Sequence, residues 1–260
     1  VGLYKMKNLY VNGCSFTAGH VLKEEESWPY LLAKKLNLNL IKHARNGQSF
    51  DSIFLNTISH LSELDPKDTL VVIGTTWSTR FSVLYDDLTI NLTPGDYERE
   101  NKKNFKEKLG GKDRIASPYS IEKITYKGIA DKYYENGKID LPTEEKIKFD
   151  EVLTQANRYY NTLFKYDDNF NNNQHINLIS KIVALQCFLE HKNFKFRFVD
   201  FENVLQPLKE GLRKWEEFSI HKLIEDKNFV YLEKEHFWEG HPNSEECIKI
   251  SEVIYDSINR

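Results

Sequence analysis

The chain has 260 residues, 40% of them hydrophobic, and its 36 basic and 39 acidic residues leave a formal net charge of -3. This length and apolar content are enough for one large α/β domain, or for a domain that carries a sizeable insertion. The charge balance gives no basic surface of the kind that binds a phosphate backbone, so we expect no nucleic-acid partner.

The cysteines and the apolar runs indicate the expected cellular location of the protein. Cys14, Cys187 and Cys247 are widely spaced and form no CxxC pair, which favours free thiols over a disulfide scaffold or a structural zinc site. No apolar run approaches the roughly 20 residues that span a bilayer, and the N-terminus lacks the pattern of a secretory signal. We therefore expect a cytoplasmic protein with no membrane partner and a single domain over residues 6–260.

The first part of the chain predicts alternating strands and helices. Apolar runs next to turn residues predict strands at 8–11, 38–42 and 69–74. Apolar residues recur at helical spacing between these runs, first behind an N-cap at Ser27 and then in a second helix. The residues of these two apolar faces are Trp28, Leu31, Leu32, Leu36, Ile53, Phe54, Ile58 and Leu61. Strands separated by helices predict a parallel sheet with right-handed crossovers and ligands at its carboxyl edge.

The sequence changes character at about 85–170, where Asp, Asn, Lys, Glu and Tyr cluster around glycine and proline turns. We interpret this segment as an insertion. Helical spacing over 144–166 predicts a helical cap within it, and the remainder is expected to be loop.

The α/β pattern resumes after the insertion. We expect a helix over 175–191, a strand over 194–200, a polar helical stretch at 215–224 and a short strand over 229–232. Asn243 can cap the last helix, with Glu246 at the third position of a capping box.

Two residues at opposite ends of the chain suggest nucleophilic catalysis. Ser15 lies in the turn after the first predicted strand, and His241 opens the last helix from a loop at the same edge of the sheet. A serine hydroxyl needs a neighbouring base to take its proton, and donors where the carbonyl oxygen becomes negative. The Ser15 backbone N–H can serve as one of these donors.

Four segments resemble the blocks of the SGNH (GDSL-like) hydrolase family, in the same order. These segments are GCSFT at 13–17, NGQS at 46–49, GTTW at 74–77 and HPN at 241–243. The resemblance implies a three-layer α/β/α sandwich with a flavodoxin-like parallel sheet and an ester-cleaving reaction. It also implies that Ser15 attacks, His241 acts as base and then acid, and the Gly47 backbone N–H contributes to the oxyanion hole.

The sequence departs from the family pattern at two supporting positions. Where the third block has an asparagine oxyanion donor, this chain has Thr76, whose hydroxyl can donate one hydrogen bond. Thr75 and Ser78 are alternative hydroxyl donors. Three residues before the histidine, where the family has an aspartate, stands Trp238, so the nearest acid for orienting the imidazole is Glu239.

Other interpretations of these residues remain open. Cys14 is more consistent with a buried thiol than with a nucleophile. His236, Glu239 and His241 suggest a metal cluster, but their spacing does not put them on one helical face, so we expect no metal and no cofactor. Trp77 and Arg80 are candidate substrate-binding residues, Arg80 for a carboxylate, a sulfate or a sugar substituent, with a surface ion pair as its alternative.

These features together predict a serine esterase or deacylase acting on an acyl, most plausibly acetyl, ester of a carbohydrate or small molecule through an acyl-serine intermediate. A catalytically degraded domain that binds a glycan or a protein is one alternative, and an acyltransferase using the same serine is another. The tyrosine-rich insertion fits either a wall for sugar stacking or an oligomer contact. The oligomeric state is left open.

Overall fold

The computed structural model describes residues 6–77, 80–85, 88–92, 120–124, 130–135, 170–201, 226–232 and 241–259. Its centre is a five-stranded sheet in the order β2-β1-β3-β8-β9, with every neighbouring pair parallel. The strands are β1 (Asn8–Asn12), β2 (Asn39–Lys42), β3 (Thr69–Gly74), β8 (Lys195–Asp200) and β9 (Phe229–Tyr231). This is the flavodoxin-like order, so the predicted fold class is confirmed.

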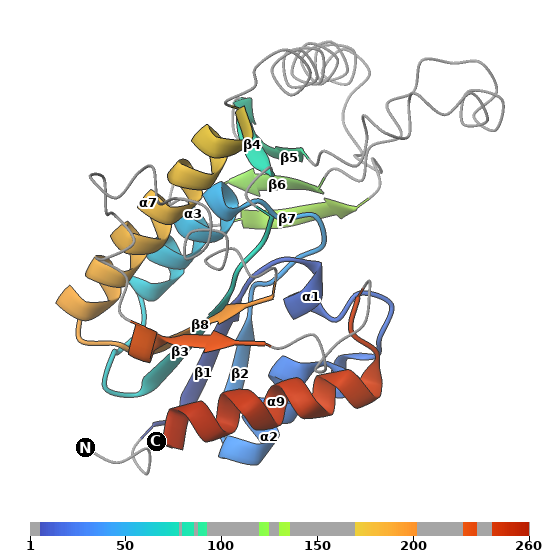
Figure 1. Ribbon diagram of the computed structural model, residues 1–260, viewed down its shortest axis with the longest axis vertical. Helices are drawn as coiled ribbons and strands as arrows, with labels where there is room; N and C mark the ends of the chain where they lie inside the picture. Colours follow the sequence, from blue (N-terminus) through green and yellow to red (C-terminus); the bar gives the residue numbers. More distant parts are fainter. Residues whose placement is uncertain are drawn as a thin grey trace, which may run out of the picture.

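Helices cover both faces of this sheet (Figure 1). One face carries α2 (Trp28–Leu36) and α9 (Ser244–Asn259), and the other carries α3 (Phe50–Leu61) and α7 (Phe170–His191). Side chains of β3 alternate between the two cores: Val71 and Ile73 pack toward α3 and α7, and Leu70 and Val72 pack toward α2 and α9. All of β3 is buried because it is a central strand with a helical layer on each side.

The helix starts follow from local hydrogen bonds. Ser49 caps α3 by accepting from the Ser52 N–H at 3.3 Å. Asn243 and Glu246 form the expected capping box of α9, because Asn243 Oδ1 accepts from the Glu246 N–H at 3.0 Å and Glu246 Oε2 accepts from the Asn243 N–H at 2.7 Å. Ser27 stands at the N-cap of α2, but its hydroxyl donates to the Glu24 carbonyl instead of capping.

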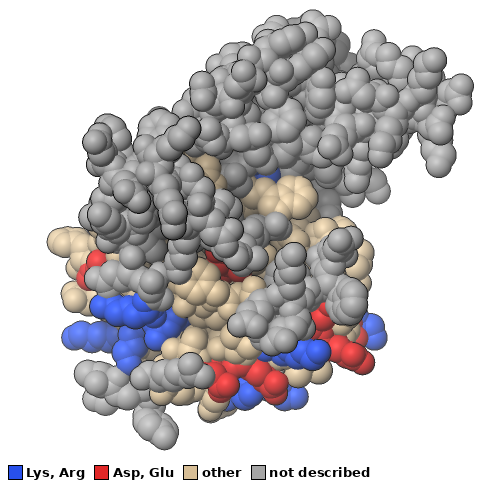
Figure 2. Space-filling view, viewed as in Figure 1, with Lys and Arg blue, Asp and Glu red and all other residues tan. Residues whose placement is uncertain are grey.

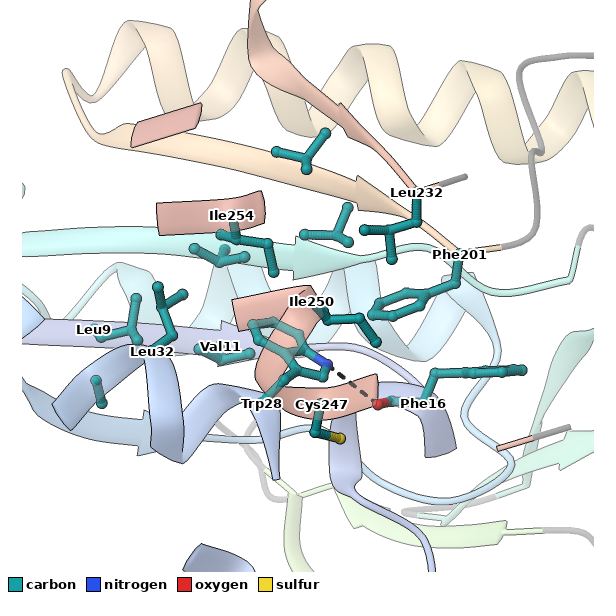
Figure 3. Close-up of a cluster of buried hydrophobic side chains, with 14 of the residues drawn as sticks. Leu9, Val11, Phe16, Trp28, Leu32, Phe201, Leu232, Cys247, Ile250 and Ile254 are labelled. Carbon is teal, nitrogen blue, oxygen red and sulfur yellow. Dashed lines mark hydrogen bonds between the residues drawn. The ribbon is translucent and has the colours of Figure 1, made fainter. Parts of the chain in front are cut away.

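The short helix α1 (Ser15–Ala18), which the sequence did not predict, is fastened to the core beneath it. The buried Trp28 ring donates from Nε1 to the Phe16 carbonyl at 3.2 Å, and the Phe16 ring stacks on Phe201 (Figure 3). The turn after β1 is therefore held against α2 and the end of β8. A second unpredicted turn, η2 (Glu24–Glu26), precedes α2.

A second sheet corrects the expectation of loop in the insertion. Its antiparallel strands are β4 (Phe81–Tyr85), β5 (Leu88–Leu92), β6 (Ser120–Ile124) and β7 (Ala130–Glu135), paired in chain order. It lies beyond the edge of the central sheet at which α1 is found (Figure 1). The expected helices at 144–166 and 215–224 lie outside the described residues.

The second sheet is joined to the first at the start of β4. The Ser82 N–H donates to Asp51 Oδ2 at 3.1 Å, and the Ser82 hydroxyl bonds to the hydroxyl of Ser49. Lys181 of α7 pairs with the same Asp51 carboxylate. The start of β4, the strand that follows β3 in the chain, is thus bonded to the N-terminal end of α3.

The described surface mixes charges of both signs. Figure 2 shows groups of basic and acidic side chains on the same face, in keeping with the small net charge of the chain. Within the ranges given above, no helix is both long and apolar enough to cross a bilayer.

Candidate active site

Ser15 and His241 meet at the carboxyl edge of the central sheet. Ser15 Oγ lies 2.7 Å from His241 Nε2, although the two residues are 226 positions apart in the chain. Ser15 is 4% exposed and opens α1 directly after β1. The order of strands reverses between β1 and β3, which is the point where ligands bind in open α/β sheets.

The turn that presents Ser15 is fixed by its neighbours. Asn12 donates from its side chain to Thr57 Oγ1 at 3.0 Å, and its Oδ1 accepts from the Gly13 N–H at 2.8 Å. A Cβ on Gly13 would lie 2.3 Å from Thr17 Oγ1, and one on Gly74 of β3 would lie 2.2 Å from the same atom. Glycine at both positions is what lets the Thr17 side chain fit between them.

Aromatic rings hold the imidazole of His241. Its ring stacks on Phe16 with 5.1 Å between centroids, and the His20 ring lies 4.6 Å away in a tilted arrangement. Burial lowers the pKa of His241 below its ordinary 6.5, and the charges of His20 and Arg80 lower it further. A lowered pKa favours the neutral imidazole, which is the form that accepts a proton.

The expected third member of the triad, Glu239, lies outside the described residues, as do Trp238 and His236. Nor does any carboxylate in the described part of the chain pair with His241. The role of Glu239 therefore stays a prediction.

The loop with Gly47 is drawn toward the serine turn. The His43 N–H donates to the Val11 carbonyl at 2.8 Å, and the Arg45 N–H donates to the Gly13 carbonyl at 3.1 Å. Gly47 has a φ of 73°, in the left-handed region that glycine adopts readily. The second block of the sequence thus lies beside the first, with a glycine at its turn.

The two threonines after β3 have different hydrogen bonds. The hydroxyl of Thr75 donates to the buried Asp200 Oδ1 at 3.1 Å and accepts from the Phe201 N–H at 3.3 Å. It is therefore committed to joining β3 and β8. The hydroxyl of Thr76 accepts from Arg80 Nη1 at 2.9 Å, which leaves its own proton to be donated elsewhere. Ser78 lies outside the described residues.

Trp77 and Arg80 pack against each other at the end of β3. The guanidinium carbon of Arg80 lies 4.8 Å from the centre of the Trp77 ring, and the ring is 40% exposed. Both candidate binding residues therefore belong to the segment that carries Thr76.

Cys14 is fully buried and its thiol lies 3.6 Å from the Thr75 carbonyl, so its side chain points into the core beside the site. Among the described side chains, no three metal-ligating groups gather in one place.

Sequence reasoning missed three residues of this site. His20 carries no motif, and it reaches His241 because α1 ends at Gly19 in the left-handed conformation and the chain turns there. Asn12 and Thr17 act by fixing the turn. For Asn12 the available signal was its position before Gly13 at the end of a strand, and for Thr17 it was only its place in the GCSFT segment.

No protein-family model matches the chain, and a search of curated proteins finds no match. Solved structures do match. One is a psychrotrophic esterase, EstA, from Pseudoalteromonas sp., at 13% identity and a TM-score of 0.45, with 97% of this chain and 97% of that chain covered.

A member of the lipolytic protein G-D-S-L family from Veillonella parvula matches at 9% identity and a TM-score of 0.44, covering 98% of this chain and 99% of that one. An acetyl xylan esterase, Est2A, from Butyrivibrio proteoclasticus matches at 11% identity and a TM-score of 0.42, covering 97% of this chain and 63% of that one. The structural neighbours thus include proteins of the family that the sequence resembles. At these identities and TM-scores the likeness decides nothing about activity, which must be argued from the site.

Proposed function

We propose that this chain is a serine ester hydrolase of the SGNH type that removes an acyl group through an acyl-Ser15 intermediate. The observation that carries the proposal is the 2.7 Å contact between Ser15 Oγ and His241 Nε2 at the switch point of the sheet. Serine activation requires a base within hydrogen-bond reach, and His241 satisfies that requirement.

The reaction begins with the attack of Ser15 Oγ on the ester carbonyl while its proton passes to His241 Nε2. The tetrahedral intermediate collapses, the bond to the alcohol breaks, and the alcohol leaves with the proton from His241. Water then attacks the acyl-serine carbonyl, gives a proton to His241 and releases the acid, and the proton returns to Ser15.

Three donors are assigned to the negative oxygen of the tetrahedral intermediate. They are the backbone N–H groups of Ser15 and Gly47 and the hydroxyl of Thr76. Support for Thr76 comes from its bond to Arg80, because a charged donor on the hydroxyl oxygen polarises the O–H bond and makes it a better donor.

Glu239 is proposed to orient the imidazole through Nδ1. For the substrate, we propose an acetyl or other short acyl ester of a carbohydrate or small molecule. An acyltransferase would use the same intermediate and differ in having an alcohol in place of water. Product analysis with an added sugar acceptor separates these two reactions.

A fluorophosphonate probe tests the proposal directly, because it forms a covalent bond only with an activated serine. We expect labelling of the native chain and none of Ser15→Ala. Ser62→Ala, which removes an exposed hydroxyl bonded only to the Ser59 carbonyl, is the matched control and keeps the label. A folded native chain that neither takes the label nor hydrolyses p-nitrophenyl acetate would contradict the hydrolase and favour a binding domain.

A further inference from the structure

Arg80 lies between β3 and β4, and the residues on either side of it contact the serine turn and the start of α3. The Thr75 carbonyl contacts the Cys14 thiol in the serine turn, and the Ser82 N–H bonds to Asp51 at the start of α3. The Arg80 N–H itself donates to the Trp77 carbonyl at 3.1 Å. The loop that carries this arginine is therefore fixed at both ends next to the site.

The charge of Arg80 has no acidic partner among the described residues. Within the described part of the chain, its side chain contacts the Thr76 hydroxyl, at 2.9 Å from Nη1, and the Trp77 ring. Its Nε is buried and makes no hydrogen bond. A cation that is partly removed from water, with no counterion in the described part of the chain, lowers the stability of the fold unless a bound anion offsets the cost.

The unused part of the guanidinium has a defined shape. With Nη1 engaged by Thr76, the parallel N–H groups of Nε and Nη2 form the other edge of the guanidinium, and Nε, although buried, has no hydrogen-bond partner among the described residues. Two parallel donors match the two oxygens of a carboxylate. The exposed Trp77 ring backs the guanidinium and restricts its orientation.

The position of Arg80 also fits a group attached to the substrate. Arg80 bonds to Thr76, whose hydroxyl is one of the donors proposed for the negative oxygen, and its charge is one of the causes of the lowered pKa of His241. An anion bound by Arg80 would therefore lie next to a residue that is proposed to contact the ester carbonyl oxygen.

We propose that Arg80 binds a carboxylate carried by the ester substrate, so that the preferred substrates are anionic esters. This inference rests on the proposed ester hydrolysis and specifies its substrate class. The carboxylate can belong to the acyl group or to the alcohol, and the two cases share the same recognition chemistry.

The test compares matched esters that differ only in charge. The acyl-side pair is mono-p-nitrophenyl succinate and p-nitrophenyl succinamate, and the alcohol-side pair is 4-acetoxybenzoate and 4-acetoxybenzamide. The kcat/KM of each ester is measured after subtraction of the rate with Ser15→Ala. We expect the native protein to prefer the anionic member of one pair by about 10- to 100-fold, the range for hydrogen bonds to a charged group.

Variants of Arg80 assign the preference to this residue. Arg80→Gln should lower kcat/KM for the anionic ester far more than for its neutral partner and bring the ratio close to one. Arg80→Lys, which keeps the charge and loses the fork, should give an intermediate ratio. Lys35→Gln removes a cation of α2 that pairs with Glu252 and should leave the ratio unchanged.

A measurement on the native protein tests the proposal even if the Arg80 variants do not fold. The preference for the anionic ester should shrink as salt is raised from 0.01 to about 1 M, because ions screen the attraction. Hydrolysis of both members of each pair at equal rates overturns the anionic preference but leaves the hydrolase intact. A preference that survives Arg80→Gln overturns the role of Arg80 and also leaves the hydrolase intact. Absence of Ser15-dependent hydrolysis of all four esters overturns the proposed function, and the substrate class falls with it.

Discussion

At the scale of single residues, the environment of His241 is the feature that bears most directly on the proposed reaction. Its imidazole stacks on Phe16, faces His20 and lies within the field of Arg80. Burial and the charges of His20 and Arg80 all disfavour a charged ring, so His241 is held in the neutral form that can accept a proton.

The pH dependence of kcat/KM should report this environment. The acid limb of the profile is expected to have its midpoint below 6.5, the ordinary pKa of histidine, because the pKa of His241 is lowered. His20→Gln should move the midpoint upward, toward 6.5, since the charge of His20 is one of the causes of the lowering. The measurement is hydrolysis of p-nitrophenyl acetate at several pH values.

His191→Gln, at the exposed end of α7, serves as control and should leave the profile in place. A midpoint that falls, or stays, when His20 is replaced would contradict the assigned interaction between the two rings.

At the scale of elements, the contact between α1 and β3 places the serine turn on the sheet. Thr17 Oγ1 lies where a Cβ on Gly13 or Gly74 would have to go, and it is buried without a hydrogen-bond partner in the described part of the chain. The fit is steric, and the distance between α1 and β3 depends on it.

Replacing Gly74 should show how much this contact matters for the free energy of unfolding. Gly74→Ala would put a methyl group 2.2 Å from Thr17 Oγ1, and the overpacking is expected to cost about 1–3 kcal/mol of unfolding free energy. Thr17→Ala removes the hydroxyl and should recover at least about 1 kcal/mol of that loss in the double variant, a coupling of the size seen for residues in contact. Urea unfolding of the four proteins in the cycle measures it.

Thr17→Val is the matched control, because it replaces the hydroxyl by a methyl group of similar size and should give no recovery. Additive effects of Gly74→Ala and Thr17→Ala would show that the clash is relieved by other movements.

The sequence predicted the central elements well, for physical reasons that can be named. β3 is a continuous apolar run between a turn and a glycine, and α9 begins at a capping box written in Asn243 and Glu246. The second sheet was missed because its strands are short and lie among charged residues. The alternation of Leu88, Ile90 and Leu92 in β5 was the signal for a strand.

For the site, the block motifs and the expected parallel sheet predicted that Ser15 and His241 lie close together. The different hydrogen bonds of the Thr75 and Thr76 hydroxyls could not be predicted. They depend on Asp200 and Arg80, whose side chains contact these hydroxyls only in the folded chain. The approach of His20 to the site likewise depends on how α1 ends.

At the scale of the whole molecule, a half-buried pair of histidines, His43 and His60, makes the stability depend on pH. The rings of His43 and His60 stack with 3.7 Å between centroids, next to Tyr10. Burial, the neighbouring His60 and Arg45 lower the pKa of His43 to about 4, and burial lowers the pKa of His60 as well. Both rings are therefore neutral in the folded protein at neutral pH.

Stability should fall as the pH drops from about 6.5 toward 4. In this range unfolded His43 binds a proton while folded His43 does not, so acid favours the unfolded chain. The expected loss from this residue between pH 7 and pH 5 is about 2 kcal/mol. Urea unfolding at both pH values measures the total, and the difference between native protein and His43→Gln isolates the share of His43.

The variant should lose less stability than the native protein over this interval. An equal loss in both proteins would mean that His43 is not the group responsible.

The joining of Ser15 to His241 has a consequence for how the protein is made. The nucleophile follows the first strand of the sheet, whereas its base precedes α9, the last helix. During synthesis, a ribosome-bound chain carries Ser15 long before its proposed base, His241, has been translated. The proposed reaction thus requires the segment before α9 to be in place, so Ser15-dependent hydrolysis would report that the chain has completed its folding.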